Sequence, residues 1–178
     1  GSFLRKDHPL LAHRLRQAAK KGAQISSLHS VDDDWLMPIA HRAIVVPSML
    51  PGMLAQIVVA AAQGAGKDAP AALRGVEPVA AADVIAASLL SGERRAILLG
   101  NYAMQHPQRS QIVALAQALA ALTGATLGVC TEAANSVGGY VAGALPRSGG
   151  LNERNWIMAR SPRIAATCAA DALMKIAR

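Results

Sequence analysis

Two His-Pro pairs, His8-Pro9 and His106-Pro107, carry the side chains of this sequence that are best suited to acid–base chemistry. Histidine changes its charge near neutral pH and can therefore donate or accept a proton in catalysis. The residue before a proline prefers an extended backbone, however, and proline is favoured at the first position of a helix. Both pairs therefore predict helix entrances, and we favour this role over catalysis. The remaining histidines have no partner at a motif spacing: His13, His29 and His41.

Other residues of catalytic or binding type also lack the neighbours that their chemistry needs. Gly64-Ala65-Gly66-Lys67 resembles a phosphate-binding loop, but position 61 is alanine instead of glycine, and Asp68 stands where the motif requires Ser or Thr. The three consecutive carboxylates at 32–34 point in different directions in any regular structure, so a solvated loop is favoured over a chelating cluster. Ser136 lacks the flanking glycines of a nucleophile elbow. We therefore predict no catalytic residue and no metal site.

The segment 96–125 has the pattern of a strand, a turn and a helix. Ala96–Leu99 is a short apolar run that predicts a buried strand, and Gly100-Asn101 predicts the turn after it. The helix is expected to begin at Pro107 and to end at Gly124. Its apolar residues recur at helical spacing: Ile112, Leu115, Leu119 and Leu122. The next strand is expected at Ala125–Cys130, which gives a piece of a parallel sheet with helical crossovers.

Ligands of open parallel sheets bind at the carboxyl ends of the strands. Two loops of this sequence follow predicted strands. The candidate cofactor-binding residues in them are Gly100 and Asn101 in the first loop and Glu132 and Asn135 in the glycine-rich second one. For Glu132 and Asn135, a role in ordering the loop is an equally open alternative.

A similar pattern opens the chain, where Gly1-Ser2 is followed by His8-Pro9 and by a helix that ends at Gly22. The two proline-to-glycine distances differ by about one helical turn. We therefore expect two α/β units, at 1–75 and 76–178, of which the second contains the glycine-rich loop. No strand stands before Gly1, so either the first strand of this unit is missing or truncated, or Gly1-Ser2 is a cloning remnant. Both alternatives predict that the chain is a fragment.

Apolar runs and helical periodicity predict the other elements. Strands are expected at Ala23–Leu28 and Ala43–Val46, and helices along Leu10–Ala18, Met53–Ala62 and Val84–Leu89.

The composition limits the class of protein. The chain has 178 residues, of which 52% are hydrophobic but only 3% aromatic, and its net charge is +7. A basic balance suits nucleic acid, an anionic membrane or an acidic protein, but single-strand binding also needs aromatic platforms. No apolar run reaches the ~18 residues of a membrane span, the first residues do not form a signal peptide, and Cys130 and Cys168 have no disulfide or ligand spacing. We expect a soluble cytoplasmic protein without direct membrane insertion.

Three segments carry a family resemblance: Leu99–Pro107, the helix that leads to Leu122-Thr123-Gly124-Ala125, and Glu132–Gly139. They resemble the molybdopterin oxidoreductase family and, within it, the large iron–sulfur subunits of bacterial NADH-quinone oxidoreductase, respiratory complex I. Gly1–Leu11 is similar to the Gly-Ser-Asn-Pro segment of that family. The resemblance covers most of residues 1–150. It implies a Rossmann-like parallel sheet with flanking helices, as in domains of the formate dehydrogenase/DMSO reductase fold, with cofactor loops at Gly1, Ser2, Gly100, Asn101, Glu132 and Asn135.

The sequence also departs from the family pattern. Ser27–Ser30 stands in the place of an Asp-Pro-Arg-like segment, and Phe3-Leu4 replaces the Asn-Pro that follows Gly-Ser. The resemblance then implies a fold that is kept without its molybdenum cofactor, so that any cofactor site is weak or vestigial. Near the C-terminus, Pro162–Ala166 matches in part, but the Glu-Pro expected after it is absent.

These observations lead to three hypotheses. The first is a non-catalytic structural fragment of the iron–sulfur subunit, with the iron–sulfur clusters elsewhere in the parent chain. Its partners would be other domains of that subunit and other peripheral-arm subunits, at the cytoplasmic face of the bacterial inner membrane. The isolated fragment could form a homo-oligomer through its open sheet edge. The second is a domain that binds a nucleotide or molybdopterin guanine dinucleotide. The third, weaker hypothesis is a basic nucleic-acid-binding module.

Overall fold

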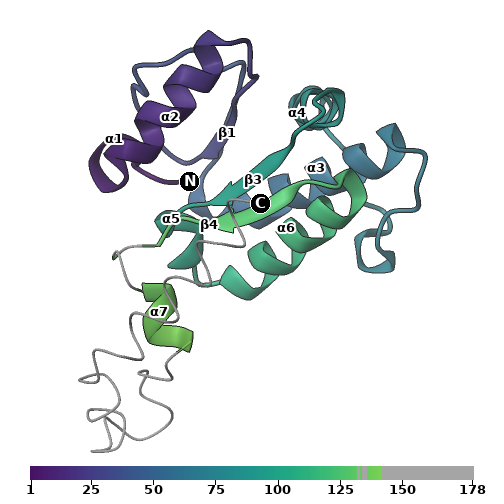
Figure 1. The fold of residues 1–178 in the computed structure, drawn as a ribbon. Coiled ribbons are helices and arrows are strands. Elements are labelled where there is room, and N and C mark those ends of the chain that lie inside the picture. Colours follow the sequence, from purple (N-terminus) through teal and green to yellow (C-terminus); the bar gives the residue numbers. More distant parts are fainter. Residues whose placement is uncertain (132, 134–135, 142–178) are drawn as a thin grey trace, which may run out of the picture. The chain divides into compact units, whose positions relative to one another are not determined.

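The computed structural model describes residues 1–131, 133 and 136–141 (Figure 1). Contacts divide the chain into two units, Gly1–Cys130 and Thr131–Arg178. In the second unit the described residues include one helix, α7 (Ser136–Val141). The first unit is a mixed α/β structure with two two-stranded sheets, and both sheets are parallel. This confirms the predicted α/β class and the parallel pairing.

The first sheet and its helices come from the start of the chain. α1 (Leu4–Asp7) and α2 (Pro9–Lys20) are followed by β1 (Ser26–His29), which pairs with β2 (His41–Ile44). Pro9 is the first residue of α2, as predicted. Gly22 follows the helix with φ of 94°, a conformation that glycine adopts without strain.

Helix α3 (Leu50–Gly64) is the centre of the core. Eleven of its 15 residues are buried, because it is apolar on nearly every side. It packs against α4 (Ala80–Ser91) and α6 (Arg109–Thr123). The short helix η1 (Pro47–Met49) leads into α3, and η2 (Ala71–Leu73) lies between α3 and α4. The sequence placed all three long helices, and the core that they form supports the second sheet.

The second sheet is formed by β3 (Ala96–Leu99) and β4 (Thr126–Val129), with α5 (Asn101–Met104) and α6 between them in sequence. β3 has the predicted bounds. Gly124, with φ of 70°, ends α6 and allows the chain to turn into β4. The strand–helix–strand order was therefore predicted correctly.

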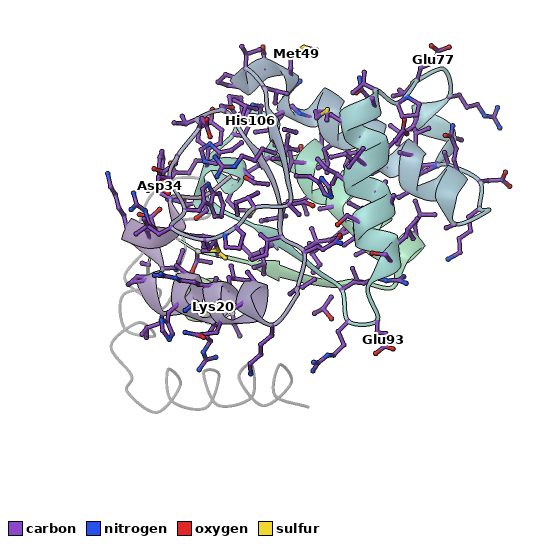
Figure 2. All side chains as sticks on the ribbon, turned by 90° about the horizontal axis from the view of Figure 1, so that it is seen from above. Lys20, Asp34, Met49, Glu77, Glu93 and His106 are labelled. Atoms are coloured by element: carbon purple, nitrogen blue, oxygen red, sulfur yellow. The ribbon has the colours of Figure 1, made fainter. Side chains whose placement is uncertain are left out.

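The predicted helix start at Pro107 is wrong. The short helix α5 begins immediately after Gly100, and α6 begins two residues after Pro107. The cause is His106, whose Nδ1 accepts a hydrogen bond from the Gln108 backbone N–H at 3.0 Å. Its Nε2 lies 3.0 Å from the Pro47 carbonyl oxygen. Figure 2 shows His106 among other side chains, whereas Glu77 and Glu93 lie at the margin. The buried His106 side chain therefore holds the His-Pro pair in a turn ahead of the helix.

The sequence repeat has a structural counterpart. In each copy, a glycine loop leads into a four-residue helix, α1 or α5, then a His-Pro pair, a long helix and a parallel strand. The two histidines differ, because His8 Nε2 is buried without a hydrogen-bond partner among the described residues. The repeat therefore concerns the backbone more than the side-chain contacts.

Two further predictions concern the organisation of the chain. Within the part that the structure describes, no helix is long and apolar enough to cross a membrane. The division into units at 1–75 and 76–178 stays a prediction. Helices α3 and α4, on either side of that boundary, share the hydrophobic core.

Candidate functional site

The two glycine loops predicted to bind a cofactor lie against each other. A Cβ atom added to Gly100 would lie within 3.0 Å of the Gly1 carbonyl group and of the Ser2 Cβ. Real side chains essentially never make such contacts, so this approach of two backbones requires glycine at position 100. Asn101 is half-buried and begins α5. The structure thus brings Gly1, Ser2 and Gly100 together from opposite ends of the unit.

His29, at the end of β1, packs between two aromatic rings beside these loops. Its ring stacks on Tyr102, with centroids 5.3 Å apart, and Phe3 meets it edge-on at 5.4 Å. The Val31 backbone N–H donates a hydrogen bond to Nδ1 at 2.9 Å, so the neutral ring carries its proton on Nε2. That Nε2 is buried without a partner in the described part of the chain. A Cβ added to Gly1 would come within 3.0 Å of the same ring, so Gly1 too is held in close contact.

Burial changes the titration of three neighbouring groups. It lowers the pKa of the Gly1 α-amino group to about 6, although the Cys130 thiolate acts in the opposite direction. It also lowers the pKa of His29, which the Gly1 ammonium lowers further and Asp33 raises. Burial raises the pKa of the Cys130 thiol, against the effect of the Gly1 ammonium. All three groups are therefore largely uncharged at neutral pH, and a protonated thiol is a poor nucleophile.

The Ser2 hydroxyl is a further buried polar group at this place. Its residue is 8% exposed, and the oxygen has no hydrogen-bond partner among residues that the structure describes. A buried hydroxyl without a partner costs about 1–3 kcal/mol. The Ser2 side chain could therefore accept an additional polar partner.

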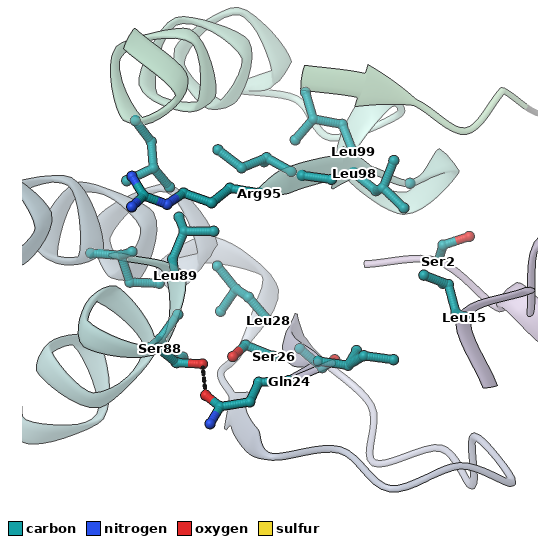
Figure 3. Close-up of a pocket in the computed structure, with 18 of the residues that line it drawn as sticks. Ser2, Leu15, Gln24, Ser26, Leu28, Ser88, Leu89, Arg95, Leu98 and Leu99 are labelled. Carbon is teal, nitrogen blue, oxygen red and sulfur yellow. Dashed lines mark hydrogen bonds between the residues drawn. The ribbon is translucent and has the colours of Figure 1, made fainter. Parts of the chain in front are cut away.

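A cavity of about 590 Å³ extends from these loops between the two sheets (Figure 3). Its walls include β1 and β3, and helices contribute Leu15 and Leu89. Gly1, Gly100 and Cys130 line one end. Gln24 and Ser88, which are joined by a 2.6 Å side-chain hydrogen bond, line it as well. The lining is largely apolar, which does not favour a highly charged ligand.

Arg95 is a cation of the cavity wall, but its guanidinium is already engaged. It donates hydrogen bonds to the carbonyl oxygens of Gly92 (2.6 Å), Leu90 (2.7 Å) and Thr123. Leu90 and Thr123 are at the C-terminal ends of α4 and α6, where carbonyl groups lack helical partners. Arg95 therefore ties two helix ends to the start of β3, and it serves structure.

The motifs that the sequence analysis rejected also have structural roles. Lys67 donates a hydrogen bond from Nζ to the Leu122 carbonyl oxygen at 2.9 Å, near the end of α6. Asp32 pairs with Arg42 at 2.6 Å, and Asp33 lies 3.7 Å from Arg5. Within the described residues, no group of three or more His, Cys, Asp or Glu side chains could hold a metal ion.

The side chains that surround the glycine contact were not predicted from the sequence. Four separate segments supply these side chains, which are His29, Phe3, Tyr102 and Cys130, and none of them stands in a catalytic or metal-binding motif. One weak signal was available, because His29 directly follows a predicted apolar strand and Cys130 is the last residue of another. Of the remaining cofactor candidates, Glu132 and Asn135 lie outside the described residues.

Comparison of the chain with protein-family models, with curated proteins and with solved structures gives no match.

Proposed function

We propose that residues 1–130 form a non-catalytic structural domain, with a Rossmann-like sheet, of the large iron–sulfur subunit of an NADH-quinone oxidoreductase. The observation that carries this proposal is the contact of Gly100 with Gly1 and Ser2. In a dinucleotide-binding loop, glycine leaves room for the pyrophosphate to approach the backbone. Here another segment of the same chain takes that room. The glycine that would admit a cofactor instead permits two segments to pack.

The chemistry of the surrounding groups supports the same proposal. A pyrophosphate needs cations or several free backbone donors. Near Gly1 burial holds the His29 ring in its uncharged form, and the Arg95 guanidinium is engaged with three carbonyl oxygens. These residues do not fit molybdopterin guanine dinucleotide, which the family resemblance implies as a cofactor. This lack of fit supports a domain with a structural role and no cofactor.

The parent protein is proposed from the residues that resemble this family, mainly Leu99–Pro107 and Gly1–Leu11. The domain would hold no cofactor of its own, and the iron–sulfur clusters would lie elsewhere in the subunit. It would contact other domains of that subunit and other peripheral-arm subunits, at the cytoplasmic face of the bacterial inner membrane. The parallel pairing of β1 with β2 and of β3 with β4 is compatible with a Rossmann-like sheet.

A binding experiment distinguishes a structural domain from a nucleotide-binding one. The chain is titrated with guanosine diphosphate and with molybdopterin guanine dinucleotide in a calorimeter. We expect no saturable heat, because the contact between Gly1 and Gly100 leaves no open loop. Saturable binding that Ser2→Ala weakens, with no change in the melting temperature, would establish the nucleotide-binding alternative.

A second experiment tests the role in the complex. Gly100→Ala is introduced into the parent polypeptide in cells, with Gly52→Ala as the control at a glycine that has open space around it. We expect fewer assembled complexes on native gels for Gly100→Ala, but an unchanged NADH–quinone turnover for each assembled complex. Normal assembly with reduced turnover per complex would contradict a purely structural role. Association of the chain with no NADH-quinone oxidoreductase subunit would refute the family assignment.

The alternative function is favoured by one observation, the buried Ser2 hydroxyl without a partner beside a cavity. A ligand with a hydrogen-bonding group could satisfy that oxygen. Saturable binding in the calorimetric titration with the two guanine nucleotides would reveal such a ligand.

A further inference from the structure

The two sheets of the first unit end in free edges that face the same cavity. β1 pairs only with β2, and β3 pairs only with β4, among the strands that the structure describes. The 590 Å³ cavity is lined by residues of β1 and β3, but by no residue of β2 or β4. The free edge of each inner strand therefore borders the cavity.

The two inner strands run in the same direction. At their carboxyl ends, His29 and Gly100 both come into contact with Gly1. At their amino ends, the Gln24 side chain, just before β1, is hydrogen-bonded to Ser88 of α4, the helix that leads into β3. A strand between β1 and β3 would therefore lie parallel to both.

The backbone groups available for such pairing follow from the existing ladders. The carbonyl oxygen of His29 accepts from Val45, and that of Leu99 accepts from Cys130. Because successive residues of a strand direct their backbone groups to opposite sides, the groups one residue earlier face the cavity. In the two strands the residues with cavity-facing backbone groups are Ser26, Leu28, Ala96 and Leu98.

The cavity has the size of a short strand. A strand in a sheet takes about 4.8 Å between its neighbours, 3.3 Å along its axis per residue and roughly 10 Å across its two faces, or about 160 Å³ per residue. A cavity of about 590 Å³ is of the same order as a few such residues, and β1 and β3, which line it, are each four residues long. Leu15 lines the cavity from α2, and Leu54 and Leu89 line it from α3 and α4. A strand buried on both faces is apolar along its length.

The exposure of β3 agrees with a missing neighbour. Its sequence Ala96-Ile97-Leu98-Leu99 is wholly apolar, as in a strand covered on both sides, yet Leu98 is 42% exposed. Leu98 is among the residues that line the cavity.

We propose that the cavity is the binding site of an apolar β-strand of about four residues, supplied by polypeptide joined directly to the amino end of Gly1. Gly100 follows β3 and leads through α5 and a His-Pro pair to α6. Gly1 leads in the same way through α1 and a His-Pro pair to α2. It lines the cavity beside the carboxyl ends of β1 and β3, where a strand parallel to both would have to end. The strand joins the two sheets into one, in the order β2, β1, added strand, β3, β4.

The inference does not depend on the proposed function, and hydrogen exchange tests it. The chain is prepared with Val-Val-Ile-Val placed directly before Gly1, and with the polar control Asp-Ser-Pro-Asn at the same place. For the apolar extension we expect exchange to slow by about tenfold or more at the four cavity-facing amides, as for a newly formed hydrogen bond. Ser27 and Ile97, whose amides already face β2 and β4, serve as internal controls and change little. Equal exchange at the four amides with both extensions overturns the proposal.

A second measurement identifies the source of the strand and does not require the extended chain to stay soluble. The unextended chain is titrated with the peptide acetyl-Val-Val-Ile-Val-amide, and the amide resonances of the same four residues are followed. Weak saturable shifts at these residues support the site. Shifts that saturate while the extended chain shows no protection mean that the strand comes from another chain, and this overturns the assignment to the segment before Gly1. An absence of shifts together with an absence of protection overturns the site itself.

Discussion

Gly100 packs against Gly1 so closely that neither position 100 nor its partner segment has room for another Cβ atom. The two residues are far apart in the sequence, and each begins one copy of the repeated loop, short helix and His-Pro pair. The contact fixes the carboxyl end of β3 beside the end of β1, where His29 and Tyr102 stack. It is therefore the junction between the two sheets.

Substitution of Gly100 by alanine should destabilise the domain strongly. The added methyl group would meet backbone atoms of Gly1, which cannot rotate away, and we expect a loss of roughly 2–3 kcal/mol in the free energy of unfolding. Gly52→Ala is the matched control, because nothing lies within 4 Å of its added Cβ and alanine favours the helix by about 1 kcal/mol. Urea denaturation of both variants measures the difference. Equal midpoints would show that the glycine contact is loose in solution.

Removal of the Arg95 guanidinium should free the ends of two helices. Arg95→Met keeps most of the side-chain volume but loses the hydrogen bonds to carbonyl groups of Leu90, Gly92 and Thr123. We expect a destabilisation of about 1–3 kcal/mol, since hydrogen bonds from charged groups contribute more than neutral ones. Arg94→Met, at an exposed neighbour, should change stability by less than about 0.5 kcal/mol. Thermal unfolding distinguishes the two, and a similar effect of both would point to net charge as the cause.

His106 should matter more than an exposed histidine. His106→Ala removes the acceptor of the Gln108 N–H and the contact with the Pro47 carbonyl oxygen, and it leaves a space in a site that is only 9% exposed. We expect a loss of about 1–3 kcal/mol. The control is His13→Ala on the exposed side of α2, which should be nearly neutral. Chemical denaturation gives both values, and a neutral His106→Ala would mean that the turn before α6 forms without the histidine side chain.

In a chain that begins at Gly1, stability should fall as the pH is lowered from about 8 to 6. The α-amino group has a pKa of 8.0 when unperturbed, but burial lowers it to about 6 in the folded chain. Between these values the unfolded chain binds more protons than the folded chain, so protonation favours unfolding. The loss can reach at most about 3 kcal/mol and is complete near pH 6. His29, whose pKa is also lowered by burial, adds a further loss below about pH 6.5.

Urea midpoints measured from pH 5 to 9 follow this dependence. Acetylation of the amino group should remove the part between pH 8 and 6 and leave the part due to His29, which His29→Gln should remove. A flat profile for the unmodified chain would show that the amino group is solvated in the folded state.

Most of the helices and strands could be predicted from the sequence, because their signals are local. The apolar run Ala96–Leu99 gave the bounds of β3, and glycine with positive φ ended the helices before β1 and β4, as the pattern around Gly22 and Gly124 indicated. The all-apolar α3 was predicted to be buried, and it is the centre of the core. The start of α6 was misplaced, because it depends on the contact between His106 and Pro47, which are 59 residues apart.

The nature of the candidate site depends on contacts between segments that are distant in the sequence. Gly1, Ser2 and Gly100 were selected from separate loops, but no local pattern shows that one loop fills the space beside the other. The stacking of His29 on Tyr102, the engagement of Arg95 with helix ends and the cavity between β1 and β3 likewise depend on segments that are distant in sequence. Such contacts arise from the packing of complete elements, whereas periodicity and turn residues report only on the few residues around them.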